Sequence, residues 1–219
     1  MSTGVIARPE LVESESLGEC WLQVSRLIME RGQPSRYDGA ATKELAHLTL
    51  LIKTPDPEDA LIRKYGDPAW LTWMHENFFT QKEVAELGNA ASYATRLFNY
   101  ANQGRDQLQW VVERLRDDPA SRSATLTTFM PLTDTSYIPC ISLLDFWVPD
   151  GELELVVYAH SLDFGKKAYG NLVELATLQA TGAEQLARPA GRLIIHVKSA
   201  HIYAPEWEDM QRLCESVSV

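Results

Sequence analysis

The sequence lacks the motifs by which several large classes of enzyme and metal protein are recognised. It contains no HExxH, GxSxG or GxGxxG segment, and its His, Cys and carboxylate residues show no zinc-ligand spacing. Its three cysteines form no CxxC pair. An odd number of unpaired cysteines argues against a disulfide framework and suits a reducing compartment. We therefore expect free thiols and no bound metal.

Positive charge and long hydrophobic runs are also scarce. Lys and Arg number 20 against 30 Asp and Glu, which gives a formal net charge of −10. This charge disfavours a protein that coats DNA, although a few local cations can still hold one free nucleotide. The most apolar run, residues 48–52, is too short to cross a bilayer, and the N-terminus has no apolar signal segment. We expect a cytoplasmic protein with neither DNA nor membrane as a partner.

The composition that remains is that of an ordinary globular protein. Hydrophobic residues make up 45% of the chain and charged residues 23%. A length of 219 residues is enough to bury one sizeable core. No linker, repeat or low-complexity segment divides the chain. We expect one domain over residues 1–219, with residues 1–15 loosely ordered.

The first half of the chain has the pattern of a mainly helical region. Apolar residues from Leu17 to Ile28 recur at helical spacing, and Gly32 with Pro34 ends the run. A β-prone run at 47–53 predicts a strand, which the turn residues 54–57 stop. We expect further helices over 58–65, 68–79, 83–101 and 108–115.

The second half has the texture of strands. The pattern predicts strands at 124–129, 140–148 and 153–158, and Pro149-Asp-Gly151 predicts a hairpin between the last two. A helix at 171–182, a strand at 193–198 and a helix at 205–215 follow. The sequence therefore predicts an α+β fold, with helices first and a mixed sheet built mostly from the second half.

Polar side chains gather at the ends of the predicted strands. Cys140 follows a proline at the start of one strand, where a thiolate can act as a nucleophile. Ser161 and Asp163 follow the end of another strand. His201 and Tyr203 lie two apart beyond a third, so both point the same way if the chain stays extended. Each residue also has a structural explanation, because a lone cysteine is commonly a small buried hydrophobe and polar residues commonly end strands.

Two further features lie near the start of the helix expected at 171–182. Asn171 stands at its start, a favourable N-terminal position for Asn whatever its function. The preceding segment 165–170 contains two lysines between glycines but lacks the spacing of a phosphate-binding loop. Neither feature identifies a function by itself.

Together, the order and spacing of these residues resemble the thymidylate synthase family, which includes the deoxycytidylate and cytidylate hydroxymethylases. The resemblance runs from about residue 88 to 208. It is carried by Ser92-Tyr93, Asp118-Pro-Ala-Ser-Arg122, Pro139-Cys140 with the hairpin after it, Ser161-x-Asp163, Asn171 and His201-Ile-Tyr203.

The resemblance implies both a fold and a reaction. The fold is a thymidylate synthase-like domain whose sheet face forms a homodimer interface. In the reaction, Cys140 adds to C6 of a pyrimidine nucleotide, and C5 then takes the one-carbon unit of 5,10-methylenetetrahydrofolate. By the resemblance, Asn171 hydrogen-bonds the base edge, His201 and Tyr203 bind the sugar hydroxyl, and Ser161 helps to bind the phosphate. Asp163 positions the pyrimidine ring and the folate, and Tyr93 belongs to the proton network near the nucleophile.

The phosphate and folate sites are implied less completely. Where the family has a second consecutive arginine the sequence has Ser123, and where it has a later arginine the sequence has His160. Lys166 or Lys167 could supply the missing charge, although only as point charges. By resemblance, Arg36, Arg122 and His160 bind the phosphate, and Arg122 reaches the partner's site. Trp70 and Trp73 bind the folate. Glu76, rather than Glu58, is the glutamate that organises water.

Three functions stay open on this evidence. The first is methylation of a uracil-type nucleotide, which the retained Asn171 favours. The second is hydroxymethylation, in which water captures the methylene intermediate before a hydride does, and which the altered phosphate cations favour. The third belongs to another class, a non-catalytic nucleotide-binding relative.

Overall fold

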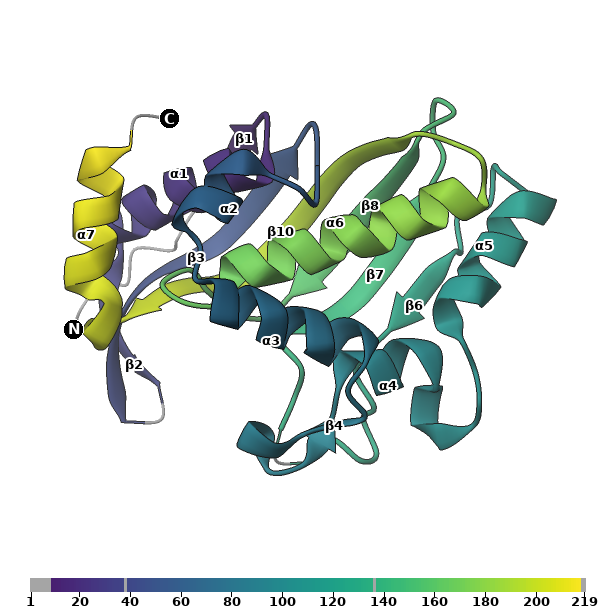
Figure 1. Ribbon diagram of the computed structural model, residues 1–219, viewed down its shortest axis with the longest axis horizontal. Coiled ribbons are helices and arrows are strands. Elements are labelled where there is room, and N and C mark those ends of the chain that lie inside the picture. The colour runs from purple at the N-terminus through teal and green to yellow at the C-terminus, as the bar shows by residue number, and fades with distance from the viewer. Residues whose placement is uncertain (1–8, 38, 136, 218–219) are drawn as a thin grey trace, which may run out of the picture.

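A computed structural model describes residues 9–37, 39–135 and 137–217 as a mixed sheet with helices packed on one face (Figure 1). The described sheet has eight strands, in the order β1-β3-β10-β8-β7-β6, with β2 paired to β3 and β9 paired to β10. Its strands are β1 (Glu10–Ser14), β2 (Gln33–Tyr37), β3 (Ala40–Ile52), β6 (Thr125–Thr127), β7 (Ile141–Trp147), β8 (Leu153–Ala159), β9 (Leu162–Asp163) and β10 (Ala190–Tyr203).

The helices and one small hairpin make up the rest. The helices are α1 (Leu17–Arg31), α2 (Ala60–Tyr65), α3 (Pro68–Phe79), α4 (Tyr93–Phe98), α5 (Gln107–Asp117), α6 (Ala168–Gln185) and α7 (Trp207–Ser216), with 3-10 turns η1 (Ala85–Leu87), η2 (Tyr100–Asn102) and η3 (Ala204–Glu206). The strands β4 (Glu83–Val84) and β5 (Ala90–Ala91) pair with each other. The predicted α+β class is therefore confirmed.

A buried glutamine ties the long helix α6 to the sheet beneath it. α6 runs across the sheet (Figure 1), and its buried positions include polar residues as well as apolar ones. The amide of Gln179 donates to the carbonyl oxygens of Leu153, Gly191 and Arg192, at 2.7, 3.0 and 3.1 Å. A buried amide with several acceptors fixes the helix against the sheet ends in one register.

Several predicted elements are found where the sequence placed them. α1 begins after Ser16, whose hydroxyl accepts from the Glu19 N–H, and ends before Gly32. α3 spans Pro68–Phe79, as predicted, and β7 pairs with β8 as an antiparallel hairpin. The strand expected at 47–53 is longer than predicted, since β3 begins at Ala40.

The helix expected over 83–101 is wrong. The segment instead folds as β4, η1, β5, α4 and η2. Gly88 and Asn89 take left-handed backbone angles, with φ of 66° and 58°, and Ala101 and Asn102 do so with φ of 54° and 57°. A helix cannot continue through such residues, so only Tyr93–Phe98 between them remains α-helical.

Two other expectations need correction. Residues 10–14, expected to be loosely ordered, form β1 in parallel register with β3; residues 1–8 lie outside the described ranges. Asn171 does not open its helix, because α6 begins at Ala168 and places Asn171 inside the first turn. The predicted start at residue 171 was too late. Residues 168–171 are all buried, so this turn lacks the alternation of buried and exposed positions that marks a helix in the sequence.

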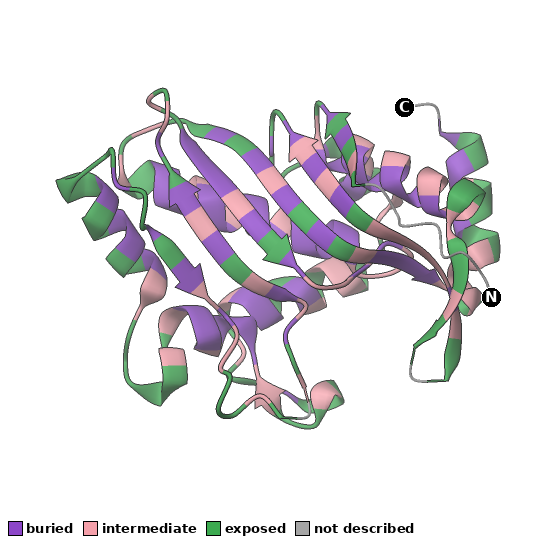
Figure 2. Cartoon of the chain, turned by 180° about the vertical axis from the view of Figure 1, so that it is seen from behind, coloured by how far each residue is buried: buried purple, intermediate pink, exposed green. Residues whose placement is uncertain are grey.

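Among the residues that the structure describes, no element covers the face of the sheet opposite the helices (Figure 2). Side chains alternate along β7, so Leu144 and Phe146 enter the core while Leu143 and Trp147 face outward, 40% and 43% exposed. Tyr158 of β8 pairs with Leu143 in the register and is 42% exposed. Large apolar side chains on an open sheet face are suited to contact with a second protein surface.

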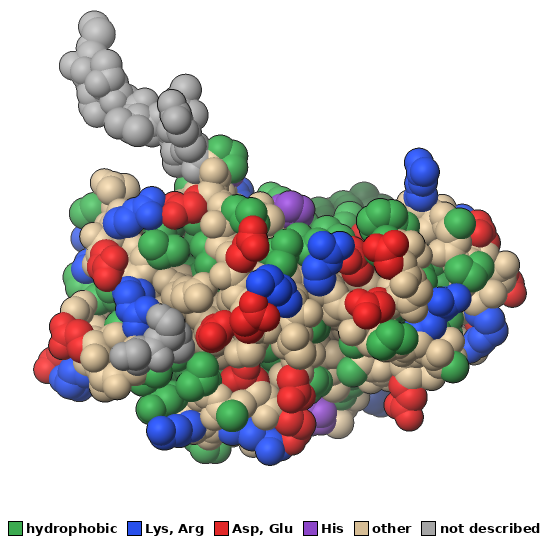
Figure 3. All heavy atoms as spheres, turned by 90° about the horizontal axis from the view of Figure 1, so that it is seen from above, with side chains coloured by type: hydrophobic (Ala, Val, Ile, Leu, Met, Phe, Trp, Pro, Cys, Tyr) green, Lys and Arg blue, Asp and Glu red, His purple; other side chains and the backbone are tan. Residues whose placement is uncertain are grey.

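Surface charge and helix length agree with the composition. In the view of Figure 3, basic and acidic side chains are interspersed, and this face presents no continuous basic surface of the kind that tracks nucleic acid. Over the ranges that the structure describes, none of the helices combines the length and the apolar character needed to cross a bilayer.

Candidate active site

Cys140 lies directly before β7, at the strand entrance that the sequence predicted. Its carbonyl oxygen accepts the His160 N–H over 2.9 Å, which joins the entrance of β7 to the end of β8. The side chain is half-buried. Burial raises the pKa of the Cys140 thiol; the positive charge of Lys167 opposes this shift, and the carboxylate of Asp163 adds to it. The thiol therefore lies among charged groups that control how readily it ionises.

Tyr93 lies against the peptide that follows the cysteine. Its hydroxyl oxygen accepts the Ile141 N–H over 3.0 Å, and its ring stacks on Phe78 with a centroid separation of 4.3 Å. Burial, together with Cys140 and Tyr137, raises the pKa of Tyr93 well above its usual range. The tyrosine thus stays protonated and keeps its own O–H as a donor near the thiol.

A buried ion pair that the sequence did not reveal supports this arrangement. Arg96 of α4 is 2% exposed, and its guanidinium donates to both carboxylate oxygens of Asp134, at 2.7 and 2.8 Å. It also donates to the carbonyl oxygen of Thr128 over 2.7 Å. The Thr128 hydroxyl donates to the Ile141 carbonyl oxygen. The ion pair therefore fixes the chain on both sides of the segment that leads to Cys140.

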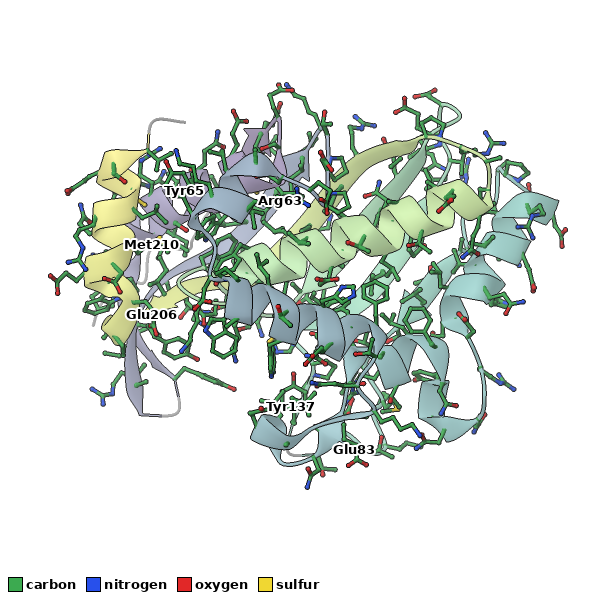
Figure 4. All side chains as sticks on the ribbon, in the orientation of Figure 1. Arg63, Tyr65, Glu83, Tyr137, Glu206 and Met210 are labelled. Carbon is green, nitrogen blue, oxygen red and sulfur yellow. The ribbon has the colours of Figure 1, made fainter. Side chains whose placement is uncertain are left out.

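Tyr137 is a second residue that sequence reasoning missed. Burial, and then Cys140, raises the pKa of Tyr137, which places its hydroxyl near the thiol. Figure 4 shows the residue in the loop region below α3. A tyrosine three positions before a cysteine in an irregular loop carries no sequence signal, so only the folded chain could identify it.

Asp163 occupies the short strand β9, in register with His201 of β10. One of its oxygens, Oδ1, accepts the Gly165 N–H over 3.1 Å. Burial and the nearby Glu206 raise the pKa of Asp163 to about 6, while Lys167 and two backbone N–H groups act in the opposite direction. An aspartate with this pKa can exchange a proton near neutral pH.

His201 and Tyr203 point the same way, as the sequence predicted. Both belong to β10, and their rings meet edge to face with centroids 5.0 Å apart. Burial lowers the pKa of His201, although Glu44 opposes the shift. The imidazole is therefore mainly neutral at pH 7 and can both donate and accept a hydrogen bond.

Ser161 and His160 lie between β8 and β9, and both are half-buried. Burial and Lys198 lower the pKa of His160. A histidine with a lowered pKa carries little positive charge at pH 7. His160 therefore offers an anion less positive charge than the residue type alone would suggest.

Asn171 is buried in the first turn of α6. Its Nδ2 donates to the Lys167 carbonyl oxygen over 2.9 Å. The same turn is fixed to α1, because Trp21 donates from its indole to the Phe164 carbonyl oxygen over 3.0 Å and packs on Tyr169. The segment from β9 into α6 is therefore held by buried contacts.

Trp70 and Trp73 form an aromatic pair with two lysines beside it. Both indoles lie on α3, half-buried, with centroids 5.4 Å apart in an edge-to-face arrangement. The Lys166 ammonium lies 4.7 Å from the Trp70 ring, and the Lys167 ammonium lies 5.6 Å from each ring. Lys167 also acts electrostatically on Cys140 and Asp163, which links the aromatic pair to the candidate nucleophile. The two indoles therefore present a partly exposed aromatic surface with cations beside it.

The geometry agrees with a family assignment. The family model described as "Thymidylate synthase" matches residues 41–217 of the chain. The chain belongs to the thymidylate synthase family. This assignment rests on most of the described structure, including every strand from β6 to β10.

Members of the family from archaea and from a virus are among the similar proteins. The chain is 28% identical over 215 residues to a protein of Methanosarcina acetivorans named "Putative thymidylate synthase", covering 95% of this chain and 96% of that one. It is 28% identical over 221 residues to a protein of the same name from Methanothermobacter marburgensis, covering 94% and 98%. It is 31% identical over 150 residues to the thymidylate synthase of Varicella-zoster virus, covering 64% and 49%.

Three residues assigned by family resemblance are exposed. Glu76 is exposed on α3, where it accepts the Gln81 amide over 3.0 Å. Arg36 is exposed on β2 and donates to the Gly39 carbonyl oxygen over 2.6 Å, and Arg122 is exposed after α5. Within the described part of the chain, no hydrogen bond or ion pair joins any of the three to Cys140 or Asp163.

A cavity of about 950 Å³ opens beside this group but does not contain the thiol. Its walls come from residues 79–83, 87–91, 94–96, 98–102 and 130–135, and from Tyr137. Neither Cys140 nor Asp163 lines it. Family chemistry needs a nucleophile, so we place the candidate active site at Cys140, between α3, β9 and the start of β7, rather than in this cavity.

Proposed function

We propose that the protein transfers a one-carbon unit from 5,10-methylenetetrahydrofolate to C5 of a uracil-type pyrimidine nucleotide. The observation that carries this proposal is the position of Cys140. The thiol stands at the start of β7 beside the Tyr93 phenol and within the electrostatic reach of Lys167 and Asp163. A nucleophile, a proton donor, a cation and a titratable acid are thus available at one strand entrance.

In this proposal Cys140 acts as a thiolate. Its sulfur forms a bond to C6 of the pyrimidine, and the C5–C6 electron pair moves toward C5 and the C4 carbonyl oxygen. C5 then bonds to the transferred carbon as one carbon–nitrogen bond of the folate breaks. The proton on C5 departs as the second carbon–nitrogen bond breaks, which releases tetrahydrofolate and leaves an exocyclic methylene. Hydride from that tetrahydrofolate, or water, adds to the methylene as the sulfur leaves C6. Lys167 favours the thiolate that begins the sequence, and Tyr93 and Asp163 are placed to move the protons.

The remaining residues bind and orient the two substrates. We assign Asn171 to the base edge, His201 and Tyr203 to the sugar hydroxyl, and Ser161 with His160 to the phosphate. Trp70 and Trp73 provide the surface for the folate ring, and the folate supplies carbon at the oxidation level of formaldehyde. Holding reactants in this way can lower a barrier by about 7–11 kcal/mol.

A hydroxymethyl product is the second candidate. If a hydride reaches the exocyclic methylene, the product is a methyl group and dihydrofolate; if water reaches it, the product is a hydroxymethyl group and tetrahydrofolate. The half-exposed indoles of Trp70 and Trp73 favour the second outcome, since they leave solvent close to the folate surface.

A binding protein without catalysis is the candidate from another class. The exposed position of Glu76 favours it, because the resemblance assigned that residue to water at the reacting atoms. Against it, Cys140 keeps Tyr93, Lys167 and Asp163 as neighbours, which a protein that only binds a nucleotide does not need.

We further propose that the protein works as a homodimer. The uncovered sheet face with Leu143, Trp147 and Tyr158 would form the interface, and Arg122 would reach the phosphate in the partner's site. If Arg122 serves the partner, Arg122→Ala should weaken nucleotide binding while the protein still dimerises. Full nucleotide affinity in a dimeric Arg122→Ala protein would exclude that role.

One incubation tests the proposed reaction. The protein is given 5,10-methylenetetrahydrofolate and a panel of pyrimidine nucleotides, and the nucleotide mass is read beside Cys140→Ala and the matched control Cys214→Ala. A gain of one methyl or one hydroxymethyl group that is lost only in Cys140→Ala establishes the reaction and chooses its product. Nucleotide binding without any mass change supports the binding protein.

A further inference from the structure

A second carboxyl group lies beside Asp163. Glu206 ends η3, and Figure 4 shows it at the start of α7. A Cβ placed on Gly165 would come within 3.0 Å of Glu206 Cβ and 3.3 Å of its Cγ. The Gly165 N–H in turn donates to Asp163 Oδ1. Glu206 therefore packs on the same turn that holds Asp163.

One oxygen of the Glu206 carboxyl lacks a hydrogen-bond donor within the described ranges. Its Oε2 is buried and has no hydrogen-bond partner among the residues that the structure describes. The residue also occupies the N-cap position of α7, yet its side chain accepts from no N–H of that helix. A buried carboxylate oxygen without a donor costs stability, so its presence points to a water molecule or a ligand N–H as its partner.

The charges around Asp163 come from several elements. Glu206 on η3 and Lys167 before α6 act on its carboxyl, and Asp163 acts in turn on Cys140 and on Tyr169 of α6. Burial and Glu206 raise the pKa of Asp163 to about 6. When Asp163 takes up a proton, its negative charge no longer opposes the Cys140 thiolate. Glu206 therefore influences the thiol through Asp163.

We propose that Glu206 is a positioning residue that packs on the Gly165 turn and keeps Asp163 able to hold and release a proton. This inference rests on the proposed function and deepens it, because it adds a partly buried glutamate to the candidate site, whereas Glu76 is exposed on α3. Glu58 is also exposed and is paired with Arg63.

A titration of Asp163 tests this role of Glu206 directly. Carboxyl-carbon NMR follows the protonation of Asp163 in the wild type, Glu206→Gln, Glu206→Asp and the control Glu208→Gln, with Asp163→Asn to assign the signal. Glu208 lies two residues on, 86% exposed. We expect the midpoint to fall from about 6 part of the way to the ordinary value of about 4 in Glu206→Gln. It should stay in place in Glu208→Gln and largely in Glu206→Asp, which keeps the charge.

The pH dependence of kcat is a second measurement, and a purely structural role of Glu206 would not shift it. In Glu206→Gln the acidic limb of kcat against pH should move down with the Asp163 midpoint, and Glu206→Asp should restore it. An unmoved midpoint, or an equal shift in Glu208→Gln, overturns the inference whatever the activity. If the midpoint moves while the wild type transfers no carbon to any nucleotide, the role of Glu206 stands and the proposed function fails.

Discussion

Removing the acidic partner of Arg96 should destabilise the protein strongly. Arg96 and the Asp134 side chain are only 2% and 5% exposed, so water cannot replace a lost partner. In Asp134→Ala two guanidinium N–H groups lose their acceptor, and the Met130 N–H, which donates to Asp134 Oδ2 over 2.7 Å, loses its own. Breaking a buried pair in this way costs about 3–5 kcal/mol of unfolding free energy.

The same cost can be read as a melting temperature. For a chain of this size about 1 kcal/mol lowers the midpoint by roughly 2–4 °C, so Asp134→Ala should melt roughly 6–20 °C below the wild type. Urea unfolding followed by circular dichroism measures the free energy itself. The control is Glu208→Ala, which breaks an exposed pair with Arg212 and should cost at most about 1 kcal/mol.

A paired replacement separates charge burial from packing. In Arg96→Met with Asp134→Leu no buried charge is left without a partner, so this double variant should be more stable than Asp134→Ala alone. A loss below about 1 kcal/mol in Asp134→Ala would refute the reasoning, since it would mean that the pair behaves like one on the surface.

Three further predictions follow from the site and the sheet. Lys167→Met should slow the alkylation of Cys140 by iodoacetamide at neutral pH and move its pH midpoint up, because Lys167 holds down a thiol pKa that burial raises. Asp163→Asn should stabilise the protein by about 2–3 kcal/mol at pH 8 but not at pH 4, as measured by urea unfolding. The sign follows because the folded pKa of about 6 lies above the unfolded one, so the wild type loses this stability as pH rises through 6. Trp147→Glu on the open sheet face should shift a dimer to monomer in sedimentation, whereas Trp110→Glu on α5 should not.

Each of these predictions has a result that would contradict it. Lys166→Met is the control for the alkylation, and equal slowing in both lysine variants would mean that general surface charge is responsible. A pH-independent effect of Asp163→Asn would remove the argument from protonation. A monomeric wild-type protein would exclude the sheet face as a dimer interface.

Short-range sequence patterns were enough to predict α1, the β7–β8 hairpin and the alternation along β10. The apolar spacing from Leu17 and the stop at Gly32 predicted α1, and Pro149-Asp-Gly151 predicted the hairpin of β7 and β8. Alternation placed His201 and Tyr203 on one side of β10. These signals depend on neighbours a few residues apart, so they are readable before the chain folds.

The sequence also located the candidate nucleophile but not its surroundings. Cys140 at a strand entrance could be predicted, whereas the burial of Arg96 could not, because an arginine on a short helix is ordinarily solvated. The break within 83–101 was missed since Asn89, Ala101 and Asn102 take left-handed angles that their types only weakly favour.

Only the tertiary structure brought Asp163 and Glu206 together. Forty-three positions separate them along the chain, and their approach depends on β9 pairing with β10 and on the Gly165 turn that leaves room for the glutamate. The sequence by itself determined most of the helices, the hairpin and the types of reactive group. The fold decided which charges meet, because burial and proximity, which set the protonation of Asp163, arise only when distant segments pack.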